Sequence, residues 1–248
     1  MRAAFCAYLL ALAAAHGAAH LACRACSIAH PTFGAHQFVS IVTFAAFALV
    51  GASEWLALPD DVSAEARVHG FELPASVQLA HAMLAFQIYE CATALAEPTG
   101  RLMGPSYIMF FHHLSAACVA AALVRFGFGQ YYTPFFFGAV EISSVPLIIM
   151  DTFKARAARP PPAARVHPHR TANATTWRML QAYAGARARF PLANEVSQWS
   201  FAALFLPLRA IYFVKVSLCF WVDAYAFLGG GATRTLRRCG PRRSAPCV

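Results

Sequence analysis

Residues 36–58, HQFVSIVTFAAFALVGASEWLAL, form an apolar run that carries one charged side chain, Glu54. A helix of about 20 mainly apolar residues is long enough to cross the hydrocarbon core of a bilayer. Comparable runs occupy residues 3–21, 77–96, 105–126, 131–150 and 196–228. The sequence therefore predicts an all-α protein with five or six transmembrane spans. The last run is too long for one upright span and too short for two, which predicts a single tilted span with an interfacial extension.

The composition agrees with a membrane environment. Apolar residues make up 59% of the chain and charged residues 12%, whereas soluble domains carry about 25% charged residues. The formal net charge of +9 comes mostly from Arg in the loop 151–195 and in the tail 229–248. Arg beside membrane spans binds anionic headgroups and sets orientation. We therefore expect membrane lipids as partners, with anionic headgroups at the basic loop and tail, and no nucleic acid; protein partners are left open.

Three regions follow from this pattern. Residues 1–35 hold the first run and a loop, and the short basic start and small-residue end of that run suit either a signal peptide or a first span. Residues 36–228 form the main transmembrane domain, and residues 229–248 form a basic C-terminal tail.

Ionisable side chains lie near the middle of four different runs. They are Glu90, the pair His112 and His113, Glu141 and Arg209. Such groups are costly in the membrane core and usually line a functional site or pathway. Their similar depth predicts a helical bundle around a central polar cavity, to which Ser143 adds a hydroxyl.

Two roles remain open for the His pair. Adjacent helical residues point about 100° apart, so one imidazole can pair with Glu141 while the other faces the cavity as a base. His112, His113 and Glu141 are then the catalytic candidates if the protein is an enzyme. Alternatively, the three side chains only hold spans together by hydrogen bonds.

A second expected contact is an ion pair between Arg209 and Glu90 that aligns two spans, because an unpaired Arg at that depth is very unfavourable. The polar residues nearer the ends of the runs are expected to reach water at the interface. These are His36, His81, Lys215 and Asp223.

No metal site and no resident cofactor are predicted. His16 and His20 have the helical spacing of two metal ligands but no carboxylate nearby, and Cys23 and Cys26 form a single pair without a second one. The chain also lacks a Gly-rich phosphate loop, a Gly-x-Ser-x-Gly elbow and a His-Glu-x-x-His motif.

Several short motifs occur in an order that resembles the TLC (TRAM–Lag–CLN) domain proteins, which include ceramide synthases and lipid-homeostasis proteins of the endoplasmic reticulum. The motifs are His36 with Phe38-Val39-Ser40, Ile88-Tyr89-Glu90, Phe111-His112-His113, Glu141-Ile142-Ser143-Ser144-Val145-Pro146, Leu192-Ala193-Asn194 and Phe205 with Arg209. The resemblance covers residues 36–228 and favours an uncleaved first span. It implies a cavity around the His pair, lined by Glu90, His112, His113, Glu141, Ser143 and Arg209.

The resemblance is to the branch that does not synthesise ceramide. Ceramide synthases carry a His-Asp-x-x-Asp motif where this chain reads Ala139-Val140-Glu141. The expected function is therefore lipid binding or sensing in lipid homeostasis, in the endoplasmic reticulum. The alternative is an acyltransferase that uses the His pair as base, with acyl-CoA as co-substrate.

The sequon Asn173-Ala174-Thr175 tests the orientation of the chain. One span separates the basic loop from the basic tail, and the Arg residues of the tail crowd close to the span, which favours a cytoplasmic tail and a lumenal loop. Removal of N-glycans should then shift the mobility of the wild type but not of Asn173→Gln. Protease cleavage of the loop from the cytoplasmic side of sealed microsomes would contradict this orientation.

Overall fold

The computed structural model describes residues 2–28, 31–59, 61–69, 71, 73–96, 106–153 and 190–228, which are helical with short connections. The basic tail and most of the basic loop, with Asn173, lie outside the described residues. In chain order the elements are α1 (Arg2–Ala25), α2 (Pro31–Ala57), α3 (Ala64–Val68), α4 (Pro74–Ala96), α5 (Ser106–Phe126), α6 (Thr133–Phe136), the 3₁₀ segment η1 (Ala139–Ser143), α7 (Ser144–Phe153), α9 (Pro191–Phe205), the π-helical segment η3 (Leu206–Tyr212) and α10 (Phe213–Leu228).

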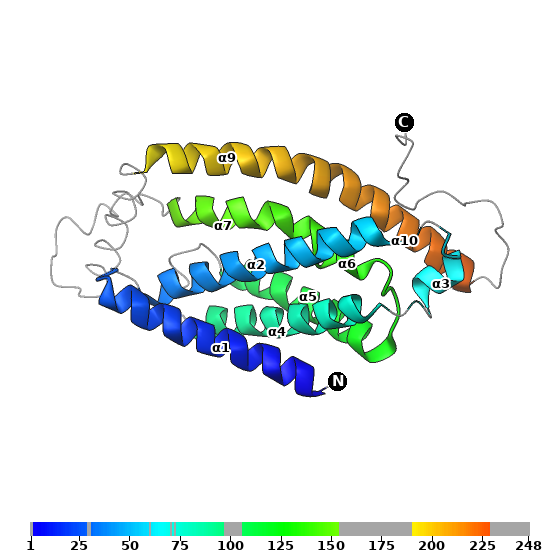
Figure 1. The fold of residues 1–248 in the computed structure, drawn as a ribbon, viewed down its shortest axis with the longest axis horizontal. Coiled ribbons are helices and arrows are strands. Elements are labelled where there is room, and N and C mark those ends of the chain that lie inside the picture. The colour runs from blue at the N-terminus through cyan, green and yellow to red at the C-terminus, as the bar shows by residue number, and fades with distance from the viewer. Residues whose placement is uncertain are drawn as a thin grey trace.

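The long helices run side by side as a bundle (Figure 1). Helix α2 lies at its centre and contacts α1, α4 and α7. Helix α5 packs against α4, and α9 packs against α7. Six helical segments in the described part of the chain are long and apolar enough to span a membrane, which confirms the predicted all-α, multi-pass membrane protein.

The surface of the bundle is apolar where lipid would surround it. Leu49, Leu95 and Trp199 are each more than 70% exposed. Large apolar side chains are exposed on α1, α2, α4, α5, α9 and α10, which is unusual for a soluble monomer and expected in hydrocarbon.

The last run forms one continuous helical segment from Pro191 to Leu228, of 38 residues. At 1.5 Å per residue it measures about 57 Å, well beyond a hydrocarbon core of about 30 Å. Its far end, in α10, packs against the short helix α3. The run therefore forms one helix rather than two, as the sequence predicts; its tilt and its interfacial extension stay predictions.

The fifth run departs from a regular helix. It is divided into α6, η1 and α7, with Gly138 between the first two. The reason is a very close backbone approach between Gly138 and Gly51 of α2. A Cβ atom added to Gly51 would lie 2.2 Å from the Cα of Gly138 and 2.4 Å from the carbonyl oxygen of Pro134. Only glycine fits at such a crossing.

Substitution of Gly51 tests this crossing. Gly51→Ala should destabilise the protein by about 1–3 kcal/mol or more, because the helices must separate to admit the methyl group. Gly17→Ala is the matched control in another span, since a Cβ there meets nothing within 4 Å, and alanine favours a helix over glycine by up to about 1 kcal/mol. Thermal unfolding of the detergent-solubilised variants measures both effects. Equal stability of Gly51→Ala and wild type would refute the close crossing.

Candidate functional site

Glu90 of α4 is the centre of the first polar cluster. The residue is 7% exposed and its carboxylate is bound from α2. Nε2 of His36 lies 2.9 Å from Oε2, and the hydroxyl of Ser40 donates to Oε1 at 2.8 Å. On the other side, Nε2 of His113 from α5 lies 3.8 Å from Oε2. One carboxylate thus joins three helices.

The hydrogen bonds fix the tautomer of His113. Its Nδ1 lies 2.7 Å from Oε1 of Gln87, and an amide oxygen only accepts, so Nδ1 carries the proton. In the neutral ring Nε2 then holds a lone pair and faces the carboxylate of Glu90. A proton placed between these two groups would be shared by a base and an anion, which is a suitable arrangement for proton transfer.

Helix α1 joins the same cluster through Tyr89. Nδ1 of His16 lies 2.7 Å from the phenol oxygen, and the ring of His36 stacks on Tyr89 with 5.9 Å between centroids. Sequence reasoning placed His36 at the interface and treated His16 only as a weak metal ligand. Both are instead parts of the Glu90 cluster. A signal in the sequence could have found them. Each lies four residues before another polar residue in an apolar run, His16 before His20 and His36 before Ser40, so each pair lies on one face of its helix.

Glu141 and Arg209 form the second cluster. Nη2 of Arg209 lies 3.0 Å from Oε2 of Glu141 and 2.8 Å from the hydroxyl oxygen of Ser144, and Nε donates to Ser143 at 3.0 Å. Ser144 also donates to Glu141. The carboxylate comes from η1 and the guanidinium from η3. Short 3₁₀ and π-helical segments often mark functional sites in helices.

The expected pairings are therefore corrected in two respects. Arg209 pairs with Glu141 and not with Glu90, and Glu90 binds His36 instead. The imidazole of His113 binds Gln87 and faces Glu90 rather than Glu141. Both corrections have one reason, which is that α4 and α5 are neighbours while α9 and η3 lie beside α7 and η1.

His112 differs from its neighbour. It is exposed, its ring centroid lies 5.4 Å from that of His113, and it interacts electrostatically with Glu141. No hydrogen bond joins the two clusters among the described side chains. His112 therefore interacts with one residue of each cluster, His113 of the first and Glu141 of the second.

A third cluster lies at the end of the bundle. Arg67 of α3 binds Asp223 of α10 through two nitrogens at 2.6 and 2.8 Å, and Tyr132 donates to the same carboxylate. The hydrogen bond with Asp223 raises the pKa of Arg67. Asp223 is 3% exposed, so the expectation that it reaches water is wrong.

Among the described residues, no group of three or more His, Cys, Asp or Glu is arranged to hold a metal ion. The chain matches no protein-family model, no curated protein and no solved structure. The site therefore stands on its own geometry, and the likeness to TLC-domain proteins rests on the motifs alone.

The pair of Glu141 and Arg209 can be tested by a double-mutant cycle. Arg209→Leu should lower stability by about 3–5 kcal/mol, because it leaves a buried carboxylate without its counter-ion. Removing both charges in Glu141→Leu/Arg209→Leu should restore a large part of that loss. Lys215→Leu, on the following turns of the same helix, is the control for loss of a cation. Additive losses in unfolding experiments would contradict the pairing.

Proposed function

We propose that the protein binds or senses a membrane lipid inside its helical bundle and acts in lipid homeostasis, in the endoplasmic reticulum. The observation that carries this proposal is an apolar groove whose lining includes residues close in sequence to the Glu141–Arg209 pair. The groove has a volume of about 600 Å³ and lies between α2, α7 and α9. Its lining includes Ile142, the residue after Glu141, and Leu204, just over one turn before Arg209.

The apolar groove and the guanidinium of Arg209 match the acyl chain and the headgroup of a lipid. Ala45 and Ala48 of α2 and Ile149 of α7 give the groove small and apolar walls against which an acyl chain can lie. The side chain of Arg209 is 30% exposed, and its Nη1 has no hydrogen-bond partner among the described residues. A guanidinium with a remaining donor suits the oxygens of a phosphate or carboxylate headgroup. The TLC-like motifs support the same class of ligand and the same membrane.

The alternative is acyl transfer, and the tautomer of His113 favours it. Nε2 would take the proton of an amine or hydroxyl while that nitrogen or oxygen attacks the thioester carbon of acyl-CoA. The carbon–sulfur bond then breaks and the thiolate of coenzyme A leaves with the proton. Release of coenzyme A thiol by purified protein, lost in His113→Gln, would favour this alternative over binding alone. The missing His-Asp-x-x-Asp motif supports binding.

Filling the groove tests lipid binding. Ser200→Phe places a ring in the groove, whereas Gln198→Phe places the same ring on the exposed face of α9. After purification in mild detergent, mass spectrometry should find several-fold less co-purified lipid per protein in Ser200→Phe than in Gln198→Phe or wild type. Equal lipid content in all three proteins would refute the groove as the binding site.

A further inference from the structure

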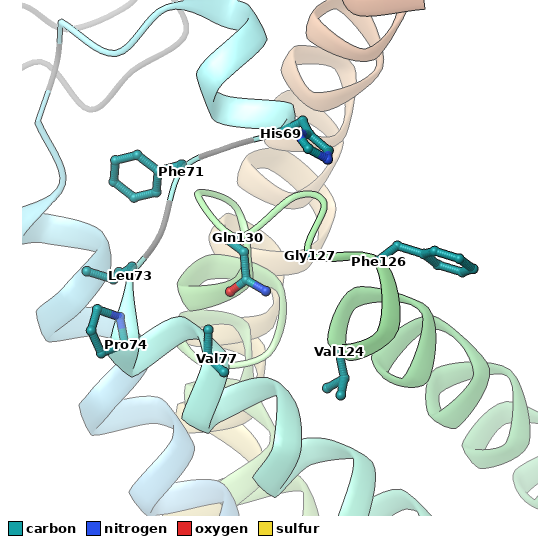
Figure 2. A pocket seen from close by; sticks show the side chains of 9 residues that line it. All are labelled: His69, Phe71, Leu73, Pro74, Val77, Val124, Phe126, Gly127 and Gln130. Carbon is teal, nitrogen blue, oxygen red and sulfur yellow. The ribbon is translucent and has the colours of Figure 1, made fainter. Parts of the chain in front are cut away.

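A second hollow, of about 390 Å³, lies at the end of the bundle where α4 begins and α5 ends (Figure 2). Leu73, Pro74 and Val77 line it from the side of α4, and Val124 and Phe126 line it from α5. Its remaining walls come from the segment around His69 and from the turn at residues 127–130. This hollow shares no lining residue with the groove beside Arg209.

His69 and Gln130 are the polar side chains among the lining residues. Gln130 is 5% exposed, and its Oε1 has no hydrogen-bond partner among the described residues. Figure 2 shows its amide directed from the turn toward Val77 and Val124. A buried polar atom without a partner costs about 1–3 kcal/mol, and folded proteins leave few of them. The amide of Gln130 is therefore positioned to form a hydrogen bond with a ligand that enters the hollow.

A second unpartnered acceptor lies on α4, one turn beyond the lining residue Val77. Nδ1 of His81 lies 2.8 Å from the carbonyl oxygen of Val77, one turn away. Because a carbonyl only accepts, Nδ1 carries the proton and Nε2 keeps a lone pair in the neutral ring. That Nε2 is buried and has no partner in the described part of the chain. Among the described residues, the amide oxygen of Gln130 is the orphan acceptor that lines the hollow, and what it lacks is a hydrogen-bond donor.

The turn that carries Gln130 is held in place. The backbone N–H of Gly129 donates to the carbonyl of Val68 at 2.6 Å, and His69 and Phe128 form an isolated β-bridge. Gly127 and Gly129 both have a φ of +66°, which glycine adopts without strain. The hollow is thus preformed by two segments that are distant in sequence.

We propose that this hollow binds an uncharged amphiphile that bears a hydroxyl group, such as a long-chain alcohol, a sterol or an acylglycerol. Its hydroxyl donates to Oε1 of Gln130, and its apolar body lies against Val77, Val124 and Phe126. A hydroxyl both donates and accepts, so it satisfies the amide in either orientation. The described side chains that line the hollow are apolar apart from His69 and Gln130, and the buried Arg67 is already paired with Asp223, so an uncharged headgroup suits the hollow.

The test compares two photoreactive probes that differ only in the donor, a diazirine-bearing decanol and its methyl ether. Each is irradiated with the purified protein in phosphatidylcholine nanodiscs, and labelled peptides are mapped by mass spectrometry. The alcohol should label residues 69–77 and 124–130 several-fold more than the ether does. Equal labelling by the two probes would overturn the proposal.

Variants then assign the labelling to Gln130. Gln130→Leu should remove the difference between alcohol and ether, while Gln37→Leu, at another buried glutamine, should retain it. Without probe, Gln130→Leu should unfold at the same temperature as wild type or higher, because an orphan acceptor is gone. A lower unfolding temperature would show that Gln130 has a permanent internal partner and would overturn the proposal. Ser200→Phe should keep the labelling, which separates this result from the fate of the lipid groove; loss of labelling there would contradict an independent site.

Discussion

A charge inside the membrane must find its counter-charge or hydrogen-bond partner within the protein, and this constraint determines which helices touch. A buried ion without a partner costs several kcal/mol. Glu90 therefore binds α4 to α2 through His36 and Ser40. Glu141 binds η1 to η3 through Arg209, and Asp223 binds α10 to α3 through Arg67. Three carboxylates thus define the neighbours of most spans, where apolar packing alone would allow many arrangements, since lipid competes with apolar side chains equally well.

The irregular helices follow from the same constraint. Arg209 lies in a π-helical segment, and Glu141 and Ser143 lie in a 3₁₀ segment that faces it. A wider turn on one helix and a tighter turn on the other shift the side chains around the helix axes until the guanidinium reaches both serines and the carboxylate. Gly51 and Gly138 make this possible, because their backbone contact holds η1 against α2 while the regular helix is interrupted. The close contact between Gly51 and Gly138 and the ion pair between Glu141 and Arg209 therefore depend on each other.

The spans could be predicted from the sequence because hydropathy and length are local properties, and residues 36–58 or 196–228 contain that information in themselves. The identity of the buried polar residues was also largely predictable, since Glu90, His113, Glu141 and Arg209 are conspicuous in apolar runs. Their pairing was not, because it depends on which helices are neighbours. Asp223 illustrates the difficulty. It lies near the end of an apolar run, where a carboxylate ordinarily reaches water, but Arg67, 156 residues away in the chain, covers it. His36 was misplaced for the same reason, since its partner lies on another helix.

The contrast between the mid-membrane clusters and the end of the bundle has a physical meaning. Around Glu90 each carboxylate oxygen has a partner, and the serines beside Arg209 are hydrogen-bonded as well. At the end of the bundle, Gln130 and His81 keep orphan acceptors although water and headgroups are nearer there. Buried atoms without a partner also occur at Ser76 and Asn194, so burial alone does not set where they lie. Of these four residues only Gln130 lines the hollow, and its amide oxygen is the one that a bound hydroxyl would satisfy.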